Sequence, residues 1–155
     1  MAVLKKQVFA CAIINLVFAL VVCVLAWYSQ ALWSVLVVAC IAAGNIVNSA
    51  FVIKLLKEMS FRRYLAGPIF TIVASVTALL GHVLLLFTAN LGATDFFEGN
   101  LFGVLFILPL FAGLLTILFF IVFVLILISL LSYITGAIIY FALYKKIPVL
   151  DYCEE

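Results

Sequence analysis

Few residues in this chain have side chains suited to acid–base or metal chemistry. His82 is the only histidine among 155 residues, and no second histidine or carboxylate stands near it in the sequence. A zinc site needs three or four ligands, so a lone histidine does not form one. We expect His82 to hydrogen-bond to a neighbouring helix, with a pH-sensing or pore-lining role as the functional alternative.

The cysteines offer no further reactive motif. Cys11, Cys23, Cys40 and Cys153 form no C-x-x-C pair and so match neither a redox nor a zinc pattern. Buried cysteines commonly act as small apolar packing residues. Because the long apolar stretches also contain no Asp, Glu, Lys or Arg, we predict that the protein is not an enzyme and binds no cofactor or metal.

Uncharged polar residues recur at helical spacing inside the apolar stretches. Residues three, four or seven positions apart share one face of a helix. In lipid, small and amide side chains allow helices to approach closely and to hydrogen-bond to one another. We therefore predict a polar layer in the inner leaflet, at the centre of a helix bundle. Its members are Asn15, Asn45, Asn48, Thr71 and Thr135, and the same face of the third stretch continues with Ser75 and His82.

The helices that hold these residues can be located from the positive charges. Every Lys and Arg belongs to one of three clusters, which long uncharged stretches separate. The clusters are Lys5 and Lys6, then Lys54, Lys57, Arg62 and Arg63, and finally Lys145 and Lys146. By the positive-inside rule, an even number of crossings between clusters places all three in the cytoplasm. We interpret them as anchors at a negatively charged membrane surface, with both termini cytoplasmic.

The composition indicates the same class of protein. The chain is 70% hydrophobic and 9% charged, with a mean hydropathy of +1.51. An ordinary soluble domain has about 25% charged residues. The sequence therefore predicts an all-α integral membrane protein with a single transmembrane domain. Lipid is its expected environment, and no nucleic-acid partner is expected.

Four membrane spans are predicted, each long enough to cross a hydrocarbon core of about 30 Å. Trp27 and Trp33 mark the outer boundary of the first two spans, as interfacial aromatic residues do. The first span also resembles a cleavable signal sequence, and we interpret it as a retained signal-anchor helix. The spans cover residues 7–27, 31–53, 64–88 and 116–144, with a cytoplasmic loop at 54–63 and an outer loop at 89–100.

The stretch from Leu101 to Tyr144 carries no charge and is about twice as long as a single span requires. Residues 101–115 could form a re-entrant or interfacial segment before the last span. Alternatively, one long tilted helix could bend near Pro109 or Gly113. Two full spans would place Lys145 and Lys146 outside, against the charge rule. The first two alternatives are favoured, and we predict a four-helix bundle with an extra hydrophobic segment at 101–115.

In length, number of crossings and cytoplasmic termini, the chain resembles the small tetraspan membrane proteins of vesicles and junctions, such as the MARVEL-type group. We expect a non-enzymatic scaffold or accessory subunit that works with other transmembrane subunits, with itself or within a vesicle membrane. The alternative is a small oligomeric channel or transporter that uses the asparagine layer.

Overall fold

The computed structural model describes the backbone of residues 2–28, 32–58, 61–92 and 101–147. Within these ranges the chain contains helices and no strand. The elements are α1 (Ala2–Tyr28), α2 (Leu32–Glu58), the short 3-10 helix η1 (Arg62–Tyr64), α3 (Ala66–Gly92) and α4 (Leu101–Lys146). The four α-helices are long and apolar enough to span a membrane. The predicted all-helical architecture is thus confirmed for the described residues, and its four apolar helices are consistent with a multi-pass membrane protein.

The helices form because the sequence is apolar on all sides over long stretches. In a bilayer no water bonds to backbone N–H and C=O groups, so these groups must bond within the helix. Hydroxyl side chains follow the same rule: Thr77 and Thr116 each donate a 2.8 Å hydrogen bond to the carbonyl four residues earlier. Pro68 lies in the first turn of α3, where a missing N–H costs no helical hydrogen bond.

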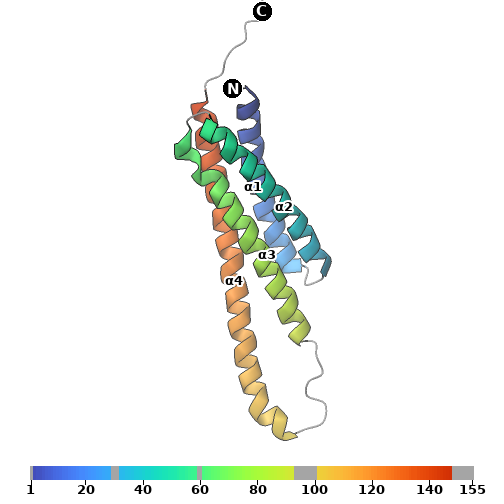
Figure 1. The fold of residues 1–155 in the computed structure, drawn as a ribbon. Coiled ribbons are helices and arrows are strands. Elements are labelled where there is room, and N and C mark those ends of the chain that lie inside the picture. Colours follow the sequence, from blue (N-terminus) through green and yellow to red (C-terminus); the bar gives the residue numbers. More distant parts are fainter. Residues whose placement is uncertain (1, 29–31, 59–60, 93–100, 148–155) are drawn as a thin grey trace, which may run out of the picture.

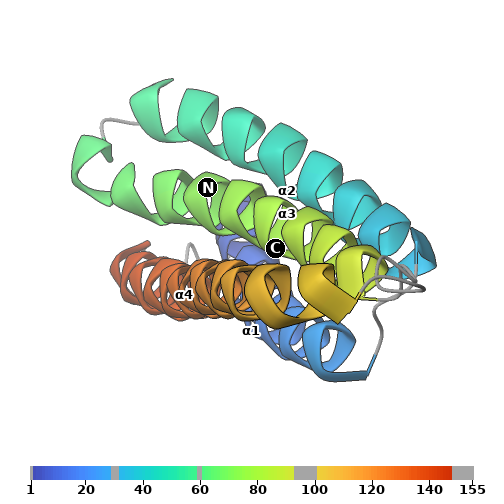
Figure 2. The same cartoon turned by 90° about the horizontal axis from the view of Figure 1, so that it is seen from below.

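Figures 1 and 2 show how the helices are arranged. α3 lies between α2 and α4 and packs against both, and α1 packs mainly on α4. α1 and α2 are consecutive in the sequence, yet they contact each other much less than they contact α4 and α3, respectively. The bundle therefore has an open side between α1 and α2.

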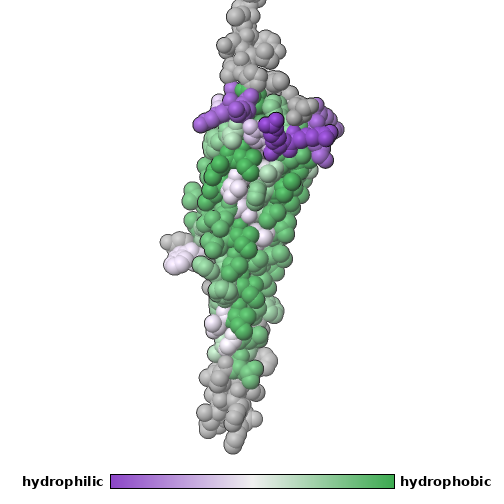
Figure 3. Space-filling model, turned by 90° about the vertical axis from the view of Figure 1, so that its left-hand side faces the viewer, coloured by the Kyte–Doolittle hydropathy of each residue, from purple (hydrophilic) through white to green (hydrophobic). Residues whose placement is uncertain are grey.

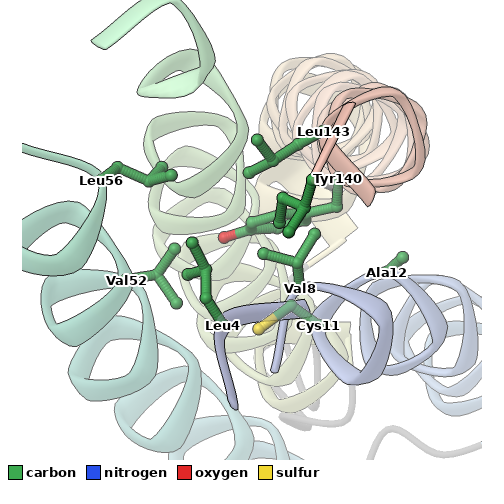
Figure 4. Packing of buried hydrophobic residues seen from close by; sticks show 9 residues of the cluster. Leu4, Val8, Cys11, Ala12, Val52, Leu56, Tyr140 and Leu143 are labelled. Carbon is green, nitrogen blue, oxygen red and sulfur yellow. The ribbon is translucent and has the colours of Figure 1, made fainter. Parts of the chain in front are cut away.

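One apolar cluster closes the bundle near both termini. Figure 4 shows it around the ring of Tyr140, with side chains from α1, α2 and α4 directed toward one another. Close van der Waals packing of such side chains is one of the interactions that hold helices together in lipid. The cluster consists of Leu4, Val8, Cys11, Ala12, Val52, Leu56, Tyr140, Leu143 and Ile147.

The last helix differs from the favoured prediction of a separate segment at residues 101–115. α4 is a single continuous helix of 46 residues that includes this stretch. At about 1.5 Å per residue it is about 69 Å long, and Figure 1 shows it extending past the ends of the other helices. The backbone thus corresponds to the second alternative, one long helix. The predicted outer loop begins later than expected, because α3 continues to Gly92, and residues 93–100 lie outside the described ranges.

All three basic clusters lie at the same end of the bundle. Lys5 and Lys6 are in the second turn of α1, Lys54 and Lys57 near the end of α2, and the other four in η1 and the last turn of α4. Figure 3 shows hydrophilic side chains gathered at this end and a largely hydrophobic surface over the rest of that face. We call this the basic end.

Lys5 joins the first helix to the last at the basic end. Its Nζ atom lies 3.3 Å from the carbonyl oxygen of Ile147 and 4.9 Å from the centre of the Tyr144 ring. Lys6 is exposed. We expect Lys5→Ala to lower the free energy of unfolding by about 0.5–1 kcal/mol, a typical cation–π contribution, and Lys6→Ala to leave it unchanged. Unfolding by sodium dodecyl sulfate in mixed micelles measures both, and equal effects would show that Lys5 acts only as a surface charge.

Candidate functional site

Buried polar side chains meet in the half of the bundle nearer the basic end. On α1 and α2 they lie between the apolar cluster of Figure 4 and a second apolar cluster that includes Ala19, Val38 and Ala78. On α4, Tyr140 belongs to the first cluster and Tyr133 to the second. All four helices contribute to this group, which we call the polar layer. Its members are Asn15, Asn45, Ser49, Thr71, Ser75, Tyr133 and Tyr140, each with at most 4% of its surface exposed.

The first part of the layer connects α1 to α3. Asn15 Nδ2 donates a 2.8 Å hydrogen bond to Thr71 Oγ1, which in turn donates to the carbonyl oxygen of Gly67 at 3.1 Å. Gly136 of α4 makes this contact possible. A Cβ atom at this position would lie 2.9 Å from Asn15 Nδ2 and 3.2 Å from Thr71 Oγ1. A residue without a side chain is therefore needed where α4 passes this pair.

The second part connects α2, α4 and α3 through Tyr133. Ser75 Oγ donates to the carbonyl oxygen of Thr71 at 2.8 Å, so it is free to accept the Tyr133 hydroxyl proton across 3.1 Å. The Tyr133 oxygen in turn accepts a 3.4 Å hydrogen bond from Asn45 Nδ2. One hydroxyl thus holds three helices in register.

Further contacts tie the layer to the apolar cluster. The Tyr140 hydroxyl lies beside the hydroxyls of Thr71 and Ser49. Asn48 is half-buried, at the edge of the layer, and its Nδ2 atom donates to Cys11 Sγ at 3.1 Å. This bond bridges α2 and α1 near the basic end, where the two helices otherwise make little contact.

Two residues predicted from the sequence lie apart from the layer. Thr135 is half-buried, and its hydroxyl donates to Leu131 of its own helix at 2.8 Å, so it does not join the central hydrogen bonds. His82 is only 1% exposed and lies about two turns beyond Ser75 on α3. Its Nδ1 atom is 2.9 Å from the carbonyl oxygen of Ala78, and its Nε2 atom has no hydrogen-bond partner. The prediction placed His82 against a neighbouring helix, whereas its hydrogen bond lies within α3.

The layer predicted from the sequence did not include Ser49, Tyr133 or Tyr140. Tyr133 lies well inside the apolar stretch, away from the membrane boundary where tyrosine is expected, whereas Tyr140 lies closer to it, five residues before Lys145. They are seven residues apart and so share one face of α4. This pairing, with Gly136 between them, was the available signal.

The chemistry of the layer is that of neutral amides and hydroxyls. It contains no carboxylate, lysine or arginine, and within the described ranges no three His, Cys, Asp or Glu side chains group closely enough to hold a metal ion. Cys11, Cys23 and Cys40 are free thiols. The amides and hydroxyls of the polar layer are suited to hydrogen bonding between helices.

Two hollows lie on the outer sides of the described bundle. One, of about 470 Å³, lies between α1 and α2 and is lined by Gln7, Cys11, Gly44, Asn45 and Asn48 among others. The other, of about 360 Å³, is almost wholly apolar and lies between the end of α1 at Trp27 and the middle of α4. Comparison with known families, curated proteins and solved structures finds no match, so the function is inferred from the residues of this chain.

Proposed function

We propose that this protein is a non-enzymatic, multi-pass membrane protein that acts as an accessory subunit or scaffold of a larger membrane complex. The carrying observation is the exposed apolar stretch of α4 from residue 110 to residue 121. From residue 110 to residue 121 none of its side chains is buried. Leu110 is 79% exposed and Phe120 66% exposed.

The position of this stretch of α4 makes the exposure significant. Trp27, near the turn between α1 and α2, lines a hollow together with Phe119 and Phe123 of α4. Residues 101–118 therefore extend past the end of the α1–α2 hairpin, as Figure 1 shows, by about 27 Å. Apolar surface in water costs about 25 cal/mol per Å². This stretch of α4 thus requires a cover of lipid or of another transmembrane subunit.

The polar layer supports a structural role for the rest of the bundle. Its amides and hydroxyls bond to one another across helices, which fixes the depth of each helix relative to its neighbours. Eight basic residues at one end favour an orientation with that end and both termini in the cytoplasm.

A small oligomeric channel or transporter is the second candidate. It is favoured by the groove between α1 and α2, because Asn45 and Asn48 reach its lining. Facing grooves of two or more protomers would place these amides along a shared path.

The first test is the native mass of the protein after mild detergent extraction from its own membrane. We expect the protein to co-purify with larger, unrelated subunits. Ile117→Ala with Phe120→Ala should release these subunits while leaving bundle stability unchanged. Leu20→Ala with Val47→Ala is the matched control, because these side chains are equally exposed but lie on α1 and α2.

The same measurement separates the two candidates. A protein that runs alone as a monomer would contradict the accessory role. A discrete symmetric oligomer would favour the channel, and Asn45→Leu with Asn48→Leu should then abolish solute flux while the oligomer persists. If this variant loses assembly and the unaltered protein shows no measurable flux, the result would favour the scaffold.

A further inference from the structure

A pocket of about 330 Å³ lies at the basic end, between η1 and the last turn of α4. It is lined by Phe61, Arg63, Tyr64 and Lys146. Its two cations are far apart in the sequence and share one cavity because η1 packs beside the end of α4. Its volume is at the lower end of the range for small-molecule sites, about 300–1,000 Å³.

Among the residues that the structure describes, no carboxylate compensates the charge of this pocket. Arg63 and Lys146 are both exposed, and within the described ranges no carboxylate pairs with either. Glu58 is the one acidic residue in those ranges, against eight basic residues gathered at the same end. Two cations that share a cavity repel each other, so an anion bound between them would be stabilised by both.

The side chains match the chemistry of a phosphate group. Arginine presents a planar fork of N–H donors to phosphate oxygens, and lysine adds a compact charge. We propose that this pocket binds the headgroup of a phospholipid that carries a phosphate monoester, such as phosphatidic acid or a phosphorylated inositol lipid. A monoester carries close to two negative charges near neutral pH, which matches the two cations.

The other two lining residues favour a lipid over free phosphate. The rings of Phe61 and Tyr64 lie 6.5 Å apart and pack against the apolar cluster of Figure 4. A lipid in the pocket would therefore place its phosphate at the cations and its glycerol and acyl chains along apolar surface. This inference rests on the proposed insertion of the helices, because it places the basic end at the level of the headgroups.

The test compares two double variants with the same change in net charge. Arg63→Gln with Lys146→Gln removes the cations of the pocket, and Arg62→Gln with Lys145→Gln removes their sequence neighbours, which do not line it. Delipidated protein in neutral detergent is titrated with phosphatidic acid, phosphatidylinositol 4-phosphate or phosphatidylserine, and bound lipid is counted by native mass spectrometry. The readout is the affinity for each monoester lipid divided by the affinity for phosphatidylserine.

We expect this ratio to be on the order of tenfold in the unaltered protein, as charge-assisted hydrogen bonds to a second phosphate charge allow. The pocket variant should reduce it to about one, and the neighbour variant should retain it even though both affinities fall. Arg63→Lys should give an intermediate ratio, because it keeps the charge and loses the fork. Equal ratios in the two double variants would overturn the pocket in favour of diffuse attraction.

Two further arms make the result unambiguous. Displacement of the lipid by inorganic phosphate at equal concentration would show that the cavity takes soluble phosphate and would overturn the lipid assignment. Thermal unfolding should be the same in both double variants, since all four side chains are exposed. The titration uses purified protein without partner subunits, so a failure of the accessory role leaves its outcome unaffected.

Discussion

Gly136→Ala is expected to reduce the free energy of unfolding by about 1–3 kcal/mol, the usual cost of one extra methyl group in a closely packed site. The new Cβ atom would lie 2.9 Å from Asn15 Nδ2 and 3.4 Å from the carbonyl oxygen of Gly67. Asn15 cannot move away without losing its hydrogen bond to Thr71, so the steric cost and the lost bond add. Titration with sodium dodecyl sulfate in mixed micelles, followed by circular dichroism, measures the change.

Gly44→Ala is the matched control for this prediction. Gly44 also lies within a helix, but a Cβ atom there would have no neighbour within 4 Å. We expect its stability to equal that of the unaltered protein. If Gly136→Ala were also neutral, α4 would not lie against the Asn15–Thr71 pair at the distance described.

Tyr133→Phe is expected to lower the free energy of unfolding by about 1–3 kcal/mol, the range for leaving a buried polar group without its partner. The substitution removes the hydroxyl that bonds to Asn45 and Ser75 and leaves the ring in place. Ser75 still bonds to Thr71, whereas the Asn45 amide loses this acceptor. The same detergent titration applies, and amide hydrogen exchange should rise in α2 around Asn45.

Thr135→Val serves as the comparison, because it also removes one hydroxyl from α4. That hydroxyl bonds to its own helix, so we expect a change below about 0.5 kcal/mol. Similar losses in Tyr133→Phe and Thr135→Val would mean that the bonds between helices add nothing beyond a general effect on α4. A larger loss for Tyr133→Phe would assign to this residue the alignment of α2, α3 and α4.

These expectations describe a bundle whose helices are held together near its basic end by apolar packing, by neutral hydrogen bonds and by the contacts of Lys5. The apolar cluster of Figure 4, the polar layer and the bond from Lys5 to Ile147 all lie in this half. Between residues 110 and 121 of α4, by contrast, no side chain is buried. This exposed apolar stretch is the surface that the proposed accessory role would use.

The sequence alone was sufficient to predict the class of fold and the depth of polar residues such as Asn15 and Thr71 along the bundle. Apolar stretches of this length form helices because lipid offers no partner for the backbone. The three basic clusters lie at one end because each marks the same boundary of an apolar span. Counting residues from those boundaries also placed Asn15 and Thr71 at one depth, and the structure joins them by a 2.8 Å hydrogen bond.

Rotation of each helix about its own axis was decided by tertiary packing. α4 is apolar on every face, so no hydrophobic stripe indicates which side turns inward. Depth alone placed Thr135 in the polar layer, yet packing against α3 turns Tyr133, Gly136 and Tyr140 inward and leaves Thr135 bonded to its own helix. The sequence likewise could not predict that Arg63 and Lys146 line one pocket, because this depends on which helices become neighbours.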